Sequence, residues 1–306
     1  MKPKESEIEA LNISGLQGRL LHLPAPKGKK RTIVLIYGLH SSIERMYTTA
    51  LFHNQFGSVH MPDLPGFGGM DSFYTIGREP DLDSYADYLY SFLKSRRLTK
   101  DITIVSMSFG SLVVTRMLQK YPEVVDGVKD NITIVGFGRG SDFNLPSGLR
   151  WLIIGISKVF KTRFGAWLVK ALVFNRWSLQ IMFAFFRLFN PKYKLTLGEQ
   201  RREALAMETD LWSKNDARTK FYTWDLILNF DLTRNASPIA LSVHNMYTSS
   251  DQYFSAERVE ASLQKLYASY QGSLANSELH APSVLGSLEE IETLYSTEIK
   301  KLLDKS

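Results

Sequence analysis

The chain has 306 residues, of which 44% are apolar, and it contains no cysteine. This length and apolar content allow a large buried core without metals or cross-links. The absence of cysteine excludes disulfides, zinc-thiolate sites and a cysteine nucleophile. The formal net charge of +6 would suit an anionic partner, so the meaning of this charge depends on where the basic residues lie.

Residues 1–14 alternate charged with isolated apolar side chains. They lack the continuous apolar stretch of a secretory signal. A chain without cysteine also suits a reducing compartment. We therefore expect a cytoplasmic protein, with contact at a membrane surface left open.

Apolar runs of strand length alternate along the chain with longer amphipathic segments. This alternation is typical of an α/β fold, a mainly parallel sheet flanked by helices. The predicted strands are Ile33–Tyr37, Val59–Met61, Ile102–Ser106, Ile132–Gly136, Ile239–Val243 and a short one at Gly272–Leu279. The predicted helices are Leu82–Leu93, Ser111–Gln119, Ser255–Tyr270 and Ser287–Leu303.

Strand signals vanish between residues 139 and 237, where helical stretches are rich in aromatic and basic side chains. We interpret this segment as a helical cap inserted between two parts of one core, residues 1–138 and 238–306. Charges interrupt it too often for a membrane-spanning helix. Two interpretations remain, an amphipathic lid alone or a lid that also rests on an anionic bilayer. No motif supports nucleic-acid binding.

Ser108 lies in the pentapeptide Ser106–Gly110 (SMSFG), directly after the ITIV run and before a predicted helix. A serine at a tight strand-to-helix turn needs small residues two positions before and after it. Ser106 and Gly110 meet that need. The turn would expose the Ser108 hydroxyl and leave the backbone N–H of Phe109 free at the helix start, where it can stabilise an oxyanion.

Two other segments follow predicted strands, Ile36–Ser42 (IYGLHSS) and Asp63–Gly69 (DLPGFGG). With the serine pentapeptide and the chain order, they resemble the α/β-hydrolase superfamily, particularly its capped esterases, carbon-carbon hydrolases and epoxide-hydrolase-like members. The resemblance covers about Gly15–Gly138 and Pro238–Leu303. It makes Leu39 the second oxyanion N–H donor, with Tyr37 where the family usually has histidine and Ser106 where it usually has glycine.

The family order places the base after the serine and the cap, which leaves His244 and His280. His244 falls in a predicted strand, whereas His280 precedes the last helix, where the family keeps its base. The resemblance therefore implies His280 as base and Asp251, after a late strand, as its orienting acid. Asp142 is the alternative acid, and Asp251 could instead cap the next helix.

A serine nucleophile favours acyl-enzyme chemistry over the aspartate-based mechanisms of dehalogenases and epoxide hydrolases. The apolar cap predicts a small-molecule ester with an apolar acyl or alcohol portion, such as a medium-chain ester or a monoacylglycerol-like lipid. A carbon-carbon hydrolase, an acyltransferase and a non-catalytic apolar-ligand or membrane-binding protein remain alternatives. Neither glycine-rich segment has nucleotide-binding spacing, and no histidine pair has metal-ligand spacing, so we predict no cofactor and no metal.

Overall fold

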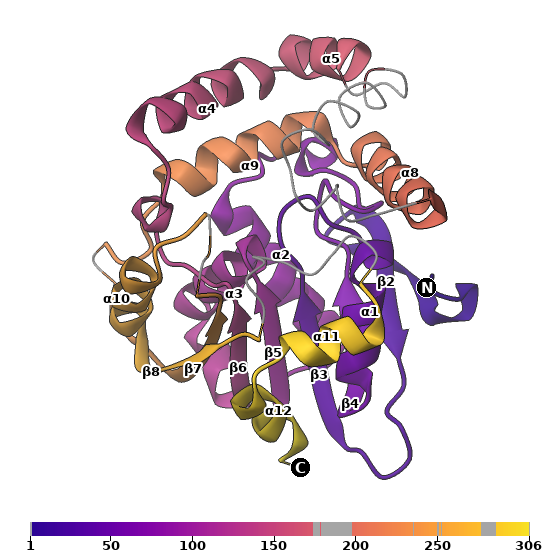
Figure 1. Ribbon diagram of the computed structural model, residues 1–306, viewed down its shortest axis with the longest axis vertical. Coiled ribbons are helices and arrows are strands. Elements are labelled where there is room, and N and C mark those ends of the chain that lie inside the picture. Colours follow the sequence, from indigo (N-terminus) through magenta and orange to yellow (C-terminus); the bar gives the residue numbers. More distant parts are fainter. Residues whose placement is uncertain are drawn as a thin grey trace.

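The computed structural model describes residues 2–173, 178, 198–234, 236–249, 251, 253–276 and 286–305. A central sheet lies between two layers of helices, and a further group of helices lies above one end of the sheet (Figure 1). The part of the chain that the model describes contains no helix long and apolar enough to cross a membrane.

The described strands form one eight-stranded sheet with the order β1-β2-β4-β3-β5-β6-β7-β8. The first strands form an antiparallel hairpin, and β2 also pairs antiparallel with β4. All other pairs are parallel. The strands are β1 (Ile8–Ile13), β2 (Leu16–Leu23), β3 (Arg31–Ile36), β4 (Gly57–Pro62), β5 (Ile102–Met107), β6 (Val128–Ile134), β7 (Ile239–Tyr247) and β8 (Tyr267–Leu274).

Helices cover both faces of this sheet, as parallel strands that are buried on both sides require. Helices α2 and α3 pack together on one face, and α1 packs with α11 on the other (Figure 1). The core helices are α1 (Ile43–Asn54), α2 (Leu82–Ser95), α3 (Phe109–Lys120), α10 (Ala256–Leu266), α11 (Leu288–Leu294) and α12 (Thr297–Asp304). Short 3₁₀ turns are η1 (Glu5–Glu7), η2 (Phe73–Ile76), η3 (Pro122–Gly127) and η4 (Gly140–Asp142).

The inserted helical region lies between β6 and β7. Its described helices are α4 (Ser147–Phe160), α5 (Arg163–Leu172), α8 (Gly198–Lys214) and α9 (Ala217–Asn229). Helix α9 packs against α4 and α5. Helices α4 and α5 lie farther from the sheet than α9 does (Figure 1).

The predicted architecture is confirmed: a mostly parallel sheet flanked by helices, with a helical insertion. Two helix boundaries differ from the prediction. The helix expected over Ser255–Tyr270 ends at Leu266, because residues from Tyr267 onward pair with β7. The helix expected over Ser287–Leu303 is two helices, since the Ser296 hydroxyl accepts a hydrogen bond from the Ile299 N–H and starts a second one.

The amino-terminal hairpin and α1 were not predicted from the sequence. The hairpin extends the sheet beyond β4 and buries Leu11, Leu16 and Leu20. Of the short strand predicted at Gly272–Leu279, residues 272–274 lie in β8 and residues 277–279 lie outside the described part of the chain.

Candidate active site

Ser108 lies between the end of β5 and the start of α3, as predicted. Its backbone angles are φ 47° and ψ −117°, a combination that side-chain-bearing residues rarely adopt. A Cβ atom on Gly110 would lie 2.5 Å from the carbonyl oxygens of Ile36 and Tyr37. The tight turn thus requires glycine two residues after Ser108, while the small Ser106 side chain two residues before it is fully buried.

The segment after β3 lies directly against Ser108. A Cβ atom on Gly38 would be 3.2 Å from both the Ser108 Cβ and the Met107 carbonyl oxygen. Leu39, the predicted oxyanion donor, follows Gly38 in a turn. Phe109 is the first residue of α3, so its N–H has no carbonyl partner within the helix. The fold therefore brings the segments of both predicted donors to the serine.

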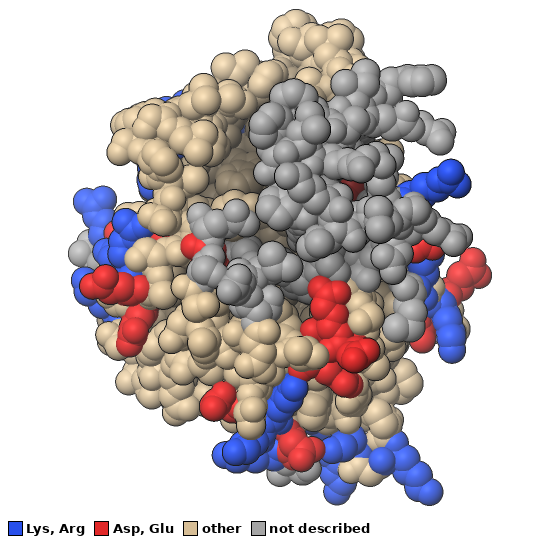
Figure 2. All heavy atoms as spheres, in the orientation of Figure 1, with Lys and Arg blue, Asp and Glu red and all other residues tan. Residues whose placement is uncertain are grey.

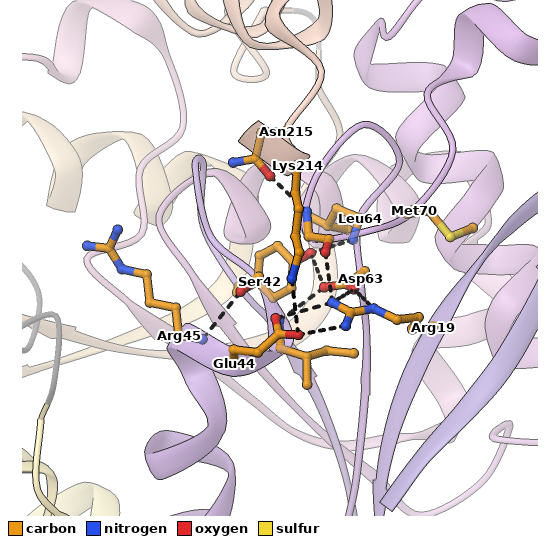
Figure 3. A network of polar contacts seen from close by, with 12 residues as sticks. Arg19, Ser42, Glu44, Arg45, Asp63, Leu64, Met70, Lys214 and Asn215 are labelled. Atoms are coloured by element: carbon orange, nitrogen blue, oxygen red, sulfur yellow. Dashed lines mark hydrogen bonds and ion pairs between the residues drawn. The ribbon is translucent and has the colours of Figure 1, made fainter. Parts of the chain in front are cut away.

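Tyr37, which stands where a histidine was expected, joins a buried polar network, whose Arg19, Glu44 and Asp63 are labelled in Figure 3. Its hydroxyl donates to Asp63 Oδ1 at 2.8 Å and accepts from the Leu64 N–H at 2.8 Å. Arg19 donates to Asp63 Oδ2 from Nε at 3.0 Å and from Nη2 at 2.7 Å, and to Glu44 Oε1 at 2.6 Å. The network thus joins β2, α1 and the segments that follow β3 and β4.

This network places two carboxylates around one guanidinium. Burial raises the pKa of Asp63 to about 6, although Arg19 and Tyr37 oppose the rise. Burial also disfavours ionised Glu44, but the hydrogen bond and charge of Arg19 prevail and lower the pKa of Glu44 to about 2. Both carboxylates are therefore mainly ionised at neutral pH and hold the Arg19 guanidinium between them.

The junction between α8 and α9 rests on the DLPGFG turn of the core. Asn215 Oδ1 accepts from the Gly68 N–H at 2.9 Å, and the Asp216 N–H donates to the Gly66 carbonyl at 2.9 Å. Glycine is needed at position 68, where φ is +68° and a Cβ would lie 2.1 Å from Asp63 Oδ1. The cap is therefore anchored on the same turn that closes the Asp63 network.

His40 lies one residue beyond Leu39 and contacts the cap, which sequence reasoning missed. Its Nδ1 lies 3.1 Å from Asn215 Nδ2 and 3.2 Å from Lys220 Nζ, and its Nε2 lies 3.5 Å from Glu208 Oε2. The His40 ring also packs against Trp212, with centroids 4.5 Å apart. These partners assign the proton to Nε2 and make Nδ1 an acceptor.

Burial governs the charges in this cluster. It lowers the pKa of His40 to about 4, with the Lys220 charge contributing, so the imidazole is neutral at neutral pH. It also lowers the pKa of Lys220 well below its ordinary value. Burial opposes ionisation of Glu208, but the hydrogen bond to His40 and the Arg45 charge lower the pKa of Glu208 to about 2. The Glu208 carboxylate in α8 thus lies against His40 in the loop after β3.

Asp251, the predicted acid, lies in the segment after β7. Its Oδ1 accepts from the Tyr253 N–H at 2.8 Å and from the Phe254 N–H at 3.1 Å. These bonds fix the carboxylate at the turn before α10, while the helix itself is capped by Ser255. The alternative that Asp251 caps this helix is therefore wrong, because the N-cap residue is Ser255.

Asp142, the alternative acid, is completely buried, and both of its oxygens are occupied. Oδ2 accepts from the backbone N–H groups of Gly138 and Arg139, at 2.9 and 3.1 Å. Oδ1 accepts from Arg139 Nε at 3.1 Å and from the Ser262 hydroxyl at 2.8 Å. Asp142 thus fastens the segment after β6 to α10.

His280, the predicted base, lies outside the described residues, so its role stays a prediction. His244 lies inside β7, paired with Ile132 and Gln271. Burial lowers its pKa, and the charges that act on it come from Asp130 and Lys305. In the parallel register His244 pairs with Ile132, which in turn pairs with Val105, so His244 lies within the sheet and not beyond the strand ends where Ser108 lies.

Within the described ranges, no group of three histidine or carboxylate side chains could hold a metal ion. The predictions of no metal and no cofactor remain predictions for the whole chain.

No protein-family model and no curated protein matches the sequence. Solved structures do match. An epoxide hydrolase is similar at 14% identity with a TM-score of 0.66, covering 97% of this chain and 95% of that one. The enol-lactonase from Burkholderia xenovorans is similar at 13% identity with a TM-score of 0.60, covering 90% of this chain and 93% of that one. The chain has the α/β-hydrolase fold.

A bacterial membrane phospholipase A shares this α/β-hydrolase fold at 13% identity with a TM-score of 0.66, covering 98% of this chain and 87% of that one. These names span different reactions. Since one fold hosts many chemistries, the α/β-hydrolase fold fixes where a site would lie, and this chain's own residues must indicate the reaction.

Proposed function

We propose that this chain is a serine hydrolase that cleaves a carboxylic ester with an apolar acyl or alcohol portion. The observation that carries the proposal is the strained backbone of Ser108, held at the strand-to-helix turn against the Gly38–Leu39 loop. Strain of about 1–3 kcal/mol persists where function uses it. At this turn the strain would present the hydroxyl near the backbone N–H groups proposed as oxyanion donors.

The proposed reaction has two steps. Ser108 Oγ attacks the ester carbonyl carbon while His280 takes its proton, and the N–H groups of Leu39 and Phe109 stabilise the oxyanion. The intermediate expels the alcohol, which receives the proton from His280. Water then attacks the acyl-enzyme with His280 again as base, and the carboxylic acid leaves as Ser108 regains its proton.

Asp251 is the better candidate for the orienting acid. Both oxygens of Asp142 already accept hydrogen bonds from Gly138, Arg139 and Ser262. An imidazole would have to displace one of these buried donors. Asp251 follows β7, where the resemblance expects the acid, and its Oδ1 accepts from the Tyr253 and Phe254 N–H groups.

The substrate class follows from the nucleophile and the cap. Serine at the nucleophile position supports acyl-enzyme chemistry rather than opening of an epoxide by a carboxylate. The similar folds named as an enol-lactonase and a phospholipase A are consistent with an ester substrate. The apolar cap suits an ester with a medium or long alkyl chain.

Hydrolysis of p-nitrophenyl esters from acetate to palmitate tests this function. We expect a rate maximum at a medium or long chain and loss of hydrolysis by about 10³-fold or more in Ser108→Ala. Asp251→Asn should lose about as much, because the imidazole tautomer would no longer be fixed. Asp142→Asn serves as the matched control and should lower stability more than the rate per folded molecule. Equal rates for wild type and Ser108→Ala would refute the assignment.

A further inference from the structure

The outer face of α4 and α5 is apolar although it faces solvent. Seven large apolar side chains there are 41–70% exposed. These residues, called here the α4–α5 face, are Leu149, Trp151, Leu152, Ile156, Val159, Phe164 and Trp167. Isolated exposed apolar residues are common, but a contiguous set of this kind marks an interaction surface.

In α4 the buried and exposed apolar residues lie on opposite sides of the helix. In α4 the buried residues Ile154 and Ser157 face α9, and the exposed Leu152, Ile156 and Val159 follow the opposite side of the helix at spacings of three and four residues. A helix that is apolar all round normally has partners on both sides. Among the described helices, α9 makes the main packing contact with α4.

Basic side chains border the aromatic part of this face. In α5 the rings of the exposed Phe164 and Trp167 lie tilted to each other with centroids 5.9 Å apart. Arg163 and Lys170, also exposed, lie one turn before and one turn after Trp167. Exposed Lys158 borders the face on α4. Neither helix contains an acidic residue, and no acidic atoms are visible over them in Figure 2.

The charge of the chain is distributed very unevenly. Residues 143–198 contain nine Lys or Arg and no Asp or Glu, whereas the rest of the chain has 28 Lys or Arg and 31 Asp or Glu. The segment that carries the exposed apolar face therefore also carries all of the surplus positive charge.

We propose that the α4–α5 face docks onto the surface of an anionic phospholipid bilayer. Aliphatic and aromatic side chains would enter the region between headgroups and acyl chains, while Lys158, Arg163 and Lys170 would pair with lipid phosphates. A second copy of this chain fits less well, because pairing two such faces would place cations against cations. Nucleic acid would match the cations but would leave the aliphatic side chains exposed.

Docking would place the cap between the bilayer and the core. Helix α9 separates α4 and α5 from the sheet (Figure 1), and the α8–α9 junction contacts the oxyanion loop through Asn215 and His40. The proposal does not depend on catalysis, so it can fail or succeed independently of Ser108.

Flotation with unilamellar vesicles tests the proposal on the full chain. We expect binding to phosphatidylcholine vesicles that contain a quarter phosphatidylglycerol, weak binding to pure phosphatidylcholine, and weaker binding to the anionic vesicles at 0.5 M than at 0.1 M NaCl. Tryptophan emission should shift to shorter wavelength on binding, since Trp151 and Trp167 would leave water. Equal behaviour on neutral and anionic vesicles, or no flotation at 0.1 M NaCl, would overturn the proposal.

Two variants separate the charge contribution from the apolar one. Lys158→Glu with Arg163→Glu and Lys170→Glu should weaken anionic-vesicle binding by about 100-fold, because each cation near the surface contributes about fivefold. Trp151→Ser with Phe164→Ser and Trp167→Ser should weaken it at least tenfold and remove most of the emission shift. All of these side chains are exposed, so circular dichroism should show the fold unchanged.

A third variant controls for net charge. Lys27→Glu with Lys30→Glu and Lys129→Glu makes the same charge change at exposed positions near the starts of β3 and β6, away from the cap. It should bind vesicles to within about twofold of wild type. Equal loss in this control would mean that total charge, not the α4–α5 face, governs binding. The proposal would also be contradicted if the wild-type protein self-associates without binding vesicles and the triple Trp151→Ser, Phe164→Ser, Trp167→Ser variant stays monomeric. That result would assign the α4–α5 face to contact with a second copy.

Discussion

Ser108 shows how one residue links backbone strain to chemistry. Its φ of 47° with ψ of −117° is accessible to glycine but costly for residues with a Cβ. The strain is maintained by the surrounding sheet, where the Ser108 N–H donates to the Ile134 carbonyl at 3.0 Å. The backbone of Ser108 is thus held by the core, which would preorganise its hydroxyl for the proposed nucleophilic role.

Paired substitutions at Ser108 should reveal this strain. We expect Ser108→Gly to have a free energy of unfolding about 1 kcal/mol higher than Ser108→Ala, because glycine relieves the strained angles. The same pair at Ser111, within α3, should show the ordinary order, with alanine the more stable by about 0.5–1 kcal/mol. Urea unfolding measures both pairs. Alanine more stable than glycine at position 108 would contradict the strain.

His53 offers a second test at this scale, unrelated to the site. The side chain is completely buried between the Thr49 carbonyl, 2.8 Å from Nδ1, and the Tyr295 hydroxyl, 3.2 Å from Nε2. Burial lowers its pKa to about 4 even though the hydrogen bond to Thr49 opposes the shift. The folded protein therefore keeps this imidazole neutral in mildly acidic solution.

Stability should accordingly fall as the pH drops from 6.5 towards 4, because in that range the unfolded chain binds a proton that folded His53 does not. Between pH 7 and pH 5 we expect a contribution of about 2 kcal/mol from this residue. In His53→Gln the decrease in unfolding free energy over this interval should be smaller by about that amount. Parallel pH curves for wild type and variant would refute this explanation.

Among the elements, two glycines near the serine have different tasks. A Cβ on Gly110 would lie 2.5 Å from two backbone oxygens that cannot move without disturbing β3, whereas a Cβ on Gly38 would meet its neighbours at 3.2 Å. A side chain at position 110 would therefore collide with the backbone, whereas one at position 38 requires the loop to shift by only a few tenths of an ångström.

Gly38→Ala should therefore lower ester hydrolysis by about tenfold or more with little loss of stability, because the Leu39 N–H moves away from the oxyanion. Gly110→Ala should instead lower the free energy of unfolding by several kcal/mol. Activity assays and urea unfolding on both variants check this contrast. Unchanged activity in a well-folded Gly38→Ala would argue against Leu39 as an oxyanion donor.

The elements that the sequence predicts well are those defined by local pattern. The ITIV run, the small residues around Ser108 and the amphipathic helix Leu82–Leu93 carry their signals within a few residues. By contrast, the first part of β8, Tyr267–Tyr270, was predicted as the end of a helix, whereas Gly272–Leu274 was predicted as strand. The pairing of Tyr267–Tyr270 with β7 depends on residues far apart in the chain and leaves no local signal.

The His40 cluster had no such local signal. Asn215 and Lys220 lie 175 and 180 residues from His40 in the chain, and nothing in the sequence around them indicates a partner in the loop after β3. A lysine that is 6% exposed departs from the usual pattern for lysine, and only the tertiary structure reveals it. The positions of Ser108 and the Gly38–Leu39 loop were predictable, while the contact of the cap with that loop was not.

At the scale of the whole molecule, the two ends of the sheet have separate tasks. The carboxyl ends of the parallel strands carry the candidate site, as expected for open α/β sheets. At the other end, buried Arg31 forms a salt bridge with Asp130 and donates to Thr103 Oγ1 at 2.6 Å and to the Leu302 carbonyl at 3.0 Å. This arginine ties β3, β5 and β6 to the last helix, α12.

Arg31→Leu should lower the free energy of unfolding by about 3–5 kcal/mol, because it leaves Asp130 and a helix carbonyl without their partner. The KM for an ester and the rate per folded molecule should stay within about twofold of wild type, since the substitution is at the opposite end of the sheet from Ser108. Urea unfolding and steady-state kinetics on the same preparation check both expectations. A large change in KM with stability intact would contradict this division.

The most direct test of the whole account is fluorophosphonate labelling followed by peptide mapping. An activated serine should react rapidly, and the adduct should map to Ser108 at about one per chain. Ser106→Ala, which removes a neighbouring buried hydroxyl, should still label, while Ser108→Ala and His280→Ala should not. Labelling at another residue, or equal labelling of wild type and Ser108→Ala, would contradict the claim that this turn forms the reactive centre.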